Sequence, residues 1–167
     1  MRPQMFEWVG EGFLELTSLK LGTWSRAKAV GRTVARLDWN LDGKADLVVG
    51  LMDSPHFILT NTSQTAANEF LSIRLVATDS ARDAIGTTIT ATIGRSHFMH
   101  QLTAGDGYAS GNERRLYLGC GSARKIDKLS IVWPSGVSQT FIDVPVSQSI
   151  ISVEGQELLT TSQQPIQ

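Results

Sequence analysis

The sequence predicts an all-β protein in which an antiparallel β-sandwich or small barrel follows one short strand–loop–strand unit. From about Asn68 to Gly155, apolar and polar residues alternate in one segment after another, and no segment there sustains a 3.6-residue period. Ahead of this region, two short β-branched apolar segments at 33–37 and 47–51 flank an acidic loop. The 167 residues, 41% of them hydrophobic, suit one globular domain or one domain with an appendage.

Three parts are expected along the chain. Residues 1–66 would hold the strand–loop–strand unit, residues 67–156 the β domain, and residues 157–167 a flexible tail. Within 1–66, the stretch 5–16 is expected to form a glycine-rich turn that leads into a short strand containing Phe13.

The acidic loop has the outline of a calcium site. Oxygen-bearing side chains stand at every second position from Asp38, and Gly43 permits a sharp turn after them. Calcium takes six to eight oxygen ligands at about 2.3–2.6 Å, and a short loop supplies them when alternate side chains point inward. The expected ligands are Asp38, Asn40, Asp42, the backbone carbonyl of Lys44, and Asp46.

Two alternatives bear on this loop. An EF-hand would need a bidentate glutamate at its twelfth position, which is Val49 here, and helices on both sides, where strands are expected. A turn without metal, in which the aspartate and asparagine side chains accept hydrogen bonds from backbone amides, remains open.

The β domain is expected to contain seven strand segments with a buried and an exposed face. Leu71, Ile73, Leu75 and Ala77 share one face of the first segment. Residues 133–136 read as a β-turn, with proline second and glycine fourth. The remaining segments are 87–93, 98–102, 115–118, 128–133, 140–144 and 149–153.

Two family resemblances accompany these patterns. The loop pattern D-x-N-x-D-G-x-x-D between strands, with 31–35 before it and 58–61 after it, resembles the FG-GAP repeat of integrin-type propellers. The segments Leu71–Gly86, Gly105–Ser110 and Lys128–Gly136 resemble the I-R-L, S-x-R-D-A-I-G, G-x-G-Y-x-S and V-x-W-P-S-G signatures of the ASPIC/UnbV domain. Ala77 and Cys120 depart from that pattern, which usually has glycine and an aliphatic residue at these positions.

These resemblances imply a function and a setting. Family members usually carry FG-GAP repeats immediately upstream, as in cartilage acidic protein, and they are associated with calcium, adhesion-like interactions and secreted or surface proteins. The chain is then expected to begin inside a repeat of a longer, exported parent. No export signal is expected near the start of this sequence, because Glu7, Glu11 and Glu15 interrupt the apolar residues there.

Two loops of the β domain are candidates for ligand contact. Arg82 and Asp83 place opposite charges side by side between two strands, although Asp83 could instead cap the amides of the next strand. Gly105 and Gly107 would let the backbone approach a ligand closely, and Tyr108 offers a ring for sugar stacking. The same three residues also fit an ordinary long hairpin loop with a packed tyrosine.

No catalytic residue is expected. His97 and His100 would point to opposite faces of a strand, and Cys120, at the end of an apolar strand, is expected to be buried. The alternative is a carbohydrate-active enzyme with a carboxylate pair such as Asp83 and Asp106, which glycoside hydrolysis would need about 5–10 Å apart.

Charge and hydropathy limit the classes of partner that the chain is expected to bind. A net charge of −1 without a basic run gives nucleic-acid binding no electrostatic support, and no window is apolar enough for a membrane-spanning helix. Asn61 begins a glycosylation sequon, which matters only in an exporting host. The sequence therefore predicts a non-catalytic module, stabilised by calcium, that binds a protein or glycan.

Overall fold

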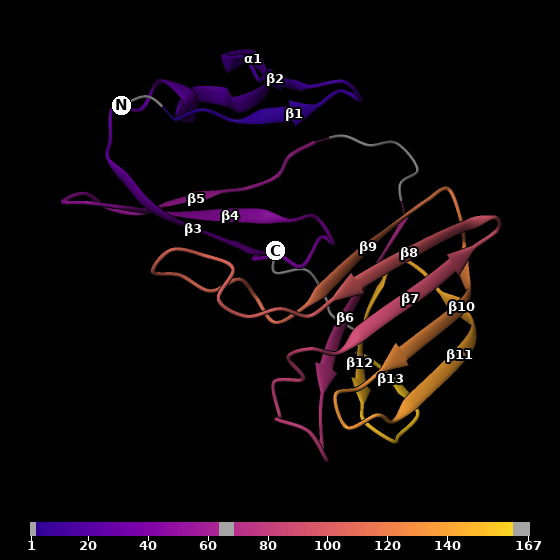
Figure 1. Cartoon of the computed structure of the whole chain (residues 1–167). Coiled ribbons are helices and arrows are strands. Elements are labelled where there is room, and N and C mark those ends of the chain that lie inside the picture. Colours follow the sequence, from indigo (N-terminus) through magenta and orange to yellow (C-terminus); the bar gives the residue numbers. More distant parts are fainter. Residues whose placement is uncertain (1–2, 64–68, 162–167) are drawn as a thin grey trace.

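The computed structural model describes residues 3–63 and 69–161 and consists almost entirely of β-strands. Figure 1 shows two units, a smaller one built from residues 3–63 and a β-sandwich built from residues 69–161. We call them the N-terminal unit and the sandwich. The predicted all-β class is confirmed, and the expected boundary at residues 66 and 67 lies outside the described residues. In the described part of the chain, no helix is long and apolar enough to cross a membrane.

The N-terminal unit begins with a small hairpin and a helical stretch. Strands β1 (Phe6–Trp8) and β2 (Phe13–Glu15) pair antiparallel around a turn in which Gly10 has φ +92°. Helix α1 (Ser18–Leu21) and the 3₁₀ helix η1 (Gly22–Arg26) follow, and no periodicity in the sequence had indicated them.

A three-stranded antiparallel sheet completes the N-terminal unit. It contains β3 (Gly31–Leu37), β4 (Asp46–Leu51) and β5 (Phe57–Leu59), in the spatial order β3-β4-β5. The acidic loop, residues 38–46, connects β3 to β4, and Leu37 pairs with Asp46 where the loop closes. The predicted strand–loop–strand unit is therefore present.

The sandwich contains two four-stranded sheets that face each other across one apolar core. Their spatial orders are β11-β10-β7-β8 and β13-β12-β6-β9. The strands are β6 (Glu69–Val76), β7 (Thr88–Ile93), β8 (Ser96–Gln101), β9 (Leu116–Gly121), β10 (Lys125–Val132), β11 (Ser138–Pro145), β12 (Gln148–Val153) and β13 (Leu158–Thr161).

The period-two pattern places alternate residues in this core. Leu71, Ile73 and Leu75 are buried together with Ile89 and Ala91, as the alternation predicts. Trp133 is the largest fully buried side chain. The amide of Gly136 donates to the carbonyl of Trp133 at 2.9 Å, which confirms the predicted β-turn.

Two features differ from the expectation for the sandwich. Strands β6 and β12 pair parallel, because the chain crosses between the sheets before β12 returns beside β6. Residues 158–161, expected in a flexible tail, form β13 and pair with β12, whose free edge supplies the hydrogen-bonding partners. The rest of the expected tail, residues 162–167, lies outside the described residues.

Candidate functional site

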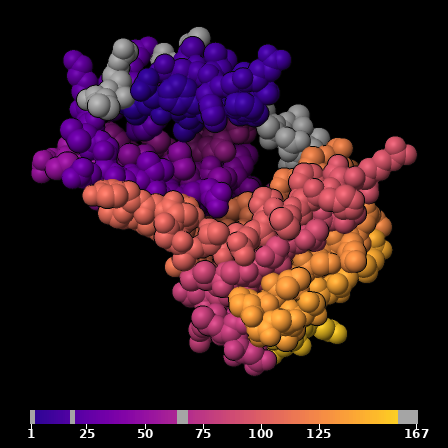
Figure 2. Space-filling model, in the orientation of Figure 1, coloured from indigo at the N-terminus to yellow at the C-terminus, as the bar shows by residue number. Residues whose placement is uncertain are grey.

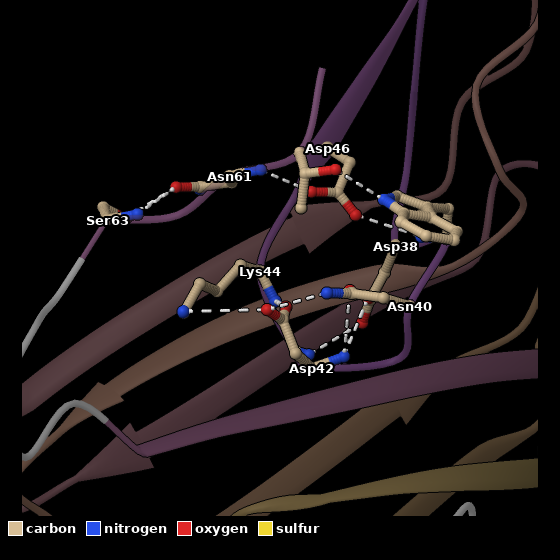
Figure 3. Close-up of polar contacts among 10 residues, drawn as sticks. Asp38, Asn40, Asp42, Lys44, Asp46, Asn61 and Ser63 are labelled. Carbon is tan, nitrogen blue, oxygen red and sulfur yellow. Dashed lines mark hydrogen bonds and ion pairs between the residues drawn. The ribbon is translucent and has the colours of Figure 1, made fainter. Parts of the chain in front are cut away.

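The acidic loop folds as a tight turn closed by its own carboxylates. The amide of Asp42 donates to Oδ1 of Asp38 at 3.0 Å, and the amide of Gly43 donates to Oδ2 at 2.8 Å. The amide of Lys44 donates in turn to Oδ1 of Asp42 at 2.9 Å (Figure 3). Gly43 adopts φ +82°, the left-handed conformation that the predicted sharp turn requires.

Asp46 ties the loop to the chain that follows β5. Its carboxylate, only 1% exposed, accepts hydrogen bonds from the amide of Trp39 at 3.1 Å and from the amide of Asn61 at 2.7 Å. The side-chain oxygen of Asn61 in turn accepts a hydrogen bond from the amide of Ser63 at 3.1 Å (Figure 3). Asp46, at the end of the loop, is therefore bonded both to Trp39 near the start of the loop and to Asn61, the first residue of the sequon.

Two side-chain nitrogen atoms of the loop contact the carboxylate of Asp42. The side-chain amide of Asn40 donates to Oδ2 of Asp42 at 3.1 Å, and the ammonium of Lys44 lies 3.6 Å from the same oxygen. The side chains of Lys44 and Asp42 are 37% and 30% exposed. Asp42 is thus the most exposed of the three carboxylates of the loop, since Asp38 and Asp46 are 6% and 1% exposed.

The surroundings of Asp38 disfavour its charged form. Burial raises its pKa, and the nearby charges of Asp42 and Asp46 raise it further, while the hydrogen bonds from the Gly43 and Asp42 amides lower it. A negative charge is therefore costly at this position, and a cation close to the loop would offset that cost.

The donor set fits calcium by its chemistry, although its carboxylates are not grouped as a ready metal site. Three carboxylates, one amide oxygen and a backbone carbonyl are hard oxygen ligands of the type that calcium prefers. Among residues 3–63 and 69–161, no three His, Cys, Asp or Glu side chains are grouped as a ready metal site. An ion in the loop would compete with Asn40 and Lys44 for Oδ2 of Asp42. The loop as described has the amide-capped form that was the alternative to a metal site.

The loop lies at the contact between the two units. The amide of Asp38 donates to Oε2 of Glu113 at 3.3 Å, and the amide of Glu113 donates to the carbonyl of Arg36 at 2.9 Å. Asn112 accepts a hydrogen bond from the Arg36 amide at 2.8 Å, and the Ser110 hydroxyl donates to the Val34 carbonyl at 3.0 Å. Residues 110–113, which we call the docking segment, therefore lie along the free edge of β3.

Side chains of the sandwich extend this contact beneath the loop. A Cβ atom placed on Gly43 would lie 2.3 Å from the Phe70 ring, so β6 packs directly against the turn. Arg115, 8% exposed, bridges Oε1 of Glu113 at 3.1 Å and the hydroxyl of Ser72 at 3.0 Å. Ser72 is consequently buried, although the strand pattern placed it on an exposed face.

Tyr117 completes the cluster around Glu113. Its hydroxyl donates to Oε2 of Glu113, and the Arg36 guanidinium lies 6.0 Å from its ring centre. Burial raises the pKa of Tyr117, and the bond to Glu113 raises it further, so the hydroxyl stays protonated as a donor. Because Glu113 also accepts the Asp38 amide, this cluster connects the sandwich to the first residue of the acidic loop.

The second predicted ligand loop supports this contact. The connection between β8 and β9 joins two different sheets, so it is not a hairpin loop, and Figure 2 shows it lying against the N-terminal unit. Gly107 approaches its own loop, since an added Cβ would lie 2.4 Å from the Ser110 hydroxyl oxygen, whereas Gly105 has open space around it. Tyr108 is 70% exposed rather than packed, with the Arg32 guanidinium 5.8 Å from its ring centre.

Arg82 and Asp83 lie in an exposed loop at the other end of β6. The carbonyl of Arg82 accepts the amide of Ala77 at 3.2 Å, and both side chains are exposed. The expected capping by Asp83 is absent from the hydrogen bonds of the described residues. Glu154 caps this loop instead, because its Oε2 accepts the amides of Thr78, Asp79 and Ser80 at 2.8, 2.9 and 3.2 Å.

Glu154 is a buried carboxylate that the sequence patterns did not single out. It is 3% exposed and also accepts a hydrogen bond from the Ser135 hydroxyl in the turn between β10 and β11. That bond and the three backbone amides lower its pKa from 4.5 to about 2. A glutamate that begins a run of exposed residues carries no local signal of burial, so only the fold could identify it.

The two carboxylates considered for catalysis belong to separate loops. Asp106 accepts a hydrogen bond from the side chain of Asn112 at 2.7 Å, which lowers its pKa, and it belongs to the connection that reaches the N-terminal unit. Figure 1 shows that connection and the loop containing Asp83 running in different directions from the sandwich.

The histidines and the cysteine agree with the sequence analysis. His97 pairs with Thr92 and His100 with Ile89, so their side chains point to opposite faces of β8. Cys120 is 6% exposed, and burial raises the pKa of its thiol. This cysteine is therefore a poor candidate for an exposed reactive group.

Comparison with known proteins identifies part of the sandwich. Residues 77–158, just under half of the chain, match the model of the family described as ASPIC and UnbV. The match contains the motifs at 82–86, 105–110 and 128–136, so the ASPIC/UnbV resemblance is confirmed for this segment. It does not reach residues 31–61, whose resemblance to an FG-GAP repeat stays a prediction. No curated protein matches the chain.

Proposed function

We propose that the chain is a non-catalytic interaction module, in which calcium held by the acidic loop stabilises the contact between an FG-GAP-like unit and an ASPIC/UnbV sandwich. The sandwich would present the surface that binds a protein or glycan. An ASPIC/UnbV domain suggests a β-rich module of a larger protein, and a surface or secreted parent is the expected setting.

One observation carries the calcium part of this proposal. Asp38 belongs to the acidic loop through its side chain and to the sandwich through its amide, which donates to Glu113 at 3.3 Å. An ion that fixes the conformation of the loop would therefore also fix Asp38, the residue that contacts the docking segment. Calcium would supply positive charge and ordered coordination at Asp38, Asn40, Asp42, the Lys44 carbonyl and Asp46.

The buried carboxylates of the acidic loop give independent support to the calcium proposal. Asp38 and Asp46 are 6% and 1% exposed, and the pKa of Asp38 is raised partly by its neighbouring carboxylates. Buried carboxylates in one loop destabilise the folded state unless hydrogen bonds or a cation compensate them. Backbone amides already provide part of that compensation, so the predicted role of calcium is stabilisation rather than a requirement for folding.

The calcium proposal is tested by thermal unfolding with and without the ion. Calcium at about 100 times its dissociation constant should stabilise the wild type by about 2.7 kcal/mol, which raises Tm by roughly 5–10 °C for a chain of this size. Asp42→Ala should abolish that response, whereas Asp83→Ala, which removes an exposed carboxylate from a distant loop, should retain it. Unchanged melting of the wild type in calcium and in chelator would refute the proposal.

The binding part of the proposal rests on the exposed loops of the sandwich. Tyr108, 70% exposed, presents an aromatic face beside Arg32, and Arg82 and Asp83 offer charged groups on a separate loop. Aromatic faces with neighbouring hydrogen-bonding groups suit sugar rings. A glycan array probed with the wild type, Tyr108→Ala and Arg82→Ala distinguishes the loops. If glycans bind to neither loop, the ligand of the module is a protein or the proposal is wrong for these residues.

A further inference from the structure

Strand β8 is an unprotected edge of the sandwich. It is the outermost strand in the order β11-β10-β7-β8, and all six of its residues are exposed. Phe98 and Met99 are 39% and 74% exposed. In Figure 2 the residues with the colour of position 100 run along the border of the sandwich.

The hydrogen-bonding groups on this edge can be assigned from the ladder with β7. The amide of Leu102 donates to the Thr87 carbonyl at 2.9 Å, so even-numbered residues of this segment direct their backbone groups toward β7. Backbone groups alternate in direction along an antiparallel strand, so those of His97, Met99 and Gln101 point outward. Within the described residues, no backbone partner covers these three.

Side chains do not block the edge. The imidazole of His97 lies 3.1 Å from the Thr92 hydroxyl, and the side-chain amide of Gln101 donates to the Gly86 carbonyl at 3.2 Å. Both polar groups therefore turn back onto their own sheet. The strand contains no Lys, Arg, Asp, Glu, Pro or Gly, and its register with β7 is unbroken from Ile93–Ser96 to Thr88–Gln101.

Three other edges of the described sheets are protected, those of β11, β9 and β3. Strand β11 ends in Pro145 and carries Asp143 at φ +55°, which forms an ion pair with Lys125 at 2.5 Å. Strand β9 contains Gly119 and Gly121, and its register with β6 shifts near Phe70. The docking segment covers the edge of β3. Proline, charges and irregular register are the usual protections of an exposed edge, and β8 has none of them.

We infer that β8 is a self-association surface, through which two copies of this chain pair antiparallel about a two-fold axis at Met99. In this register Met99 lies opposite Met99 of the other copy, and His97 lies opposite Gln101. Every outward backbone group of the three residues then finds a partner, giving about six hydrogen bonds between the copies. Two four-stranded sheets would become one continuous sheet.

A second copy is the favoured occupant because both strands already exist in the required conformation. An unfolded peptide would have to be ordered on binding, which costs free energy that a preformed strand does not lose. The pairing also covers the exposed Phe98 and Met99 side chains, with Phe98 opposite His100 of the other copy. The contact buries no Lys, Arg, Asp or Glu side chain of β8, because the strand contains none.

Site-specific crosslinking tests the register. In a Cys120→Ala background, Met99→Cys should form an intermolecular disulfide under mild oxidation, because Cα atoms of a hydrogen-bonded antiparallel pair lie about 5.5 Å apart, within disulfide range. Gln101→Cys is the matched control on the same face of the same strand. Its counterpart would lie more than about 13 Å away, so crosslinking should be weak. Equal crosslinking at both positions would overturn the proposed register.

Sedimentation velocity across a dilution series tests the association itself. The wild type should show a concentration-dependent dimer, and Met99→Pro should weaken it at least about tenfold, since it removes outward N–H groups while leaving the ladder with β7 intact. Ile142→Lys, at an exposed position of β11, should dimerise like the wild type. If circular dichroism shows that Met99→Pro is unfolded, Met99→Lys replaces it. A wild type that stays monomeric, or a dimer that survives both Met99 variants, would refute the inference.

Discussion

Replacing Gly43 by alanine tests whether the acidic loop packs on the sandwich as described. Gly43 has φ +82°, and an added Cβ would lie 2.3–2.4 Å from three atoms of the Phe70 ring. Left-handed backbone costs alanine about 1–2 kcal/mol relative to glycine. Displacing a packed ring by about 1 Å costs roughly another 1–3 kcal/mol. Gly43→Ala should therefore lower the free energy of unfolding by about 3 kcal/mol.

The two contributions can be separated with a double-mutant cycle. In a Phe70→Ala background the ring is absent, so Gly43→Ala should cost only the backbone part, about 1–2 kcal/mol. Urea unfolding of the wild type, both single variants and the double variant gives the coupling free energy, provided that each unfolds in a single transition. The expected coupling is about 1–3 kcal/mol.

The reasoning is refuted if Gly43→Ala lowers the free energy of unfolding equally with and without the Phe70 ring. If Gly43→Ala destabilises the wild type and Phe70→Ala by the same amount, the loop does not touch β6, and the contact between the units must be made elsewhere. Asn at position 43 is a useful control, because it tolerates left-handed backbone better than alanine but would still meet the ring. Its coupling to Phe70 should therefore persist while its backbone cost falls.

Three further predictions concern buried groups. Arg115→Met should lower the free energy of unfolding by about 2–3 kcal/mol in urea, because Glu113 loses its buried partner, whereas the exposed neighbour Arg114→Met should cost less than about 0.5 kcal/mol. The folded pKa of Glu154, about 2, lies below its ordinary value of 4.5, so its stabilisation is complete above about pH 4.5 and is lost as pH falls toward 2. Glu154→Gln should be less stable at neutral pH and should lose less stability over that acidic interval; an unchanged acid profile in chemical denaturation would contradict this. Cys120 should react with a thiol reagent far more slowly in the folded protein than in denaturant, and equal rates would show that it is accessible.

Strands and faces of the sandwich were predictable from local patterns. Alternation at Leu71, Ile73 and Leu75 identified the buried face of β6, and the turn at 133–136 identified the end of β10. These signals are local, because side-chain direction alternates along any strand and turn residues are restricted by their own backbone angles. The helical stretch at 18–26 was missed because it is too short to show a period.

Contacts between distant segments were not predictable in the same way. Ser72 alternates like an exposed residue, yet it is buried and its hydroxyl accepts a hydrogen bond from Arg115. Glu154 caps a loop more than seventy residues earlier in the chain. Nothing near either residue in sequence distinguishes it from a solvent-exposed polar group, since the partner that buries it belongs to another element.

For the acidic loop, the sequence by itself determined the donor types, their spacing and the glycine that turns the chain. The tertiary structure decided that these donors cap backbone amides, that Asp46 holds the segment after β5, and that Asp38 meets Glu113 of the sandwich. The physical reason is the range of the interactions: the geometry of a turn depends on a few neighbouring backbone angles, whereas the partner of a buried charge depends on which surfaces the whole fold brings together.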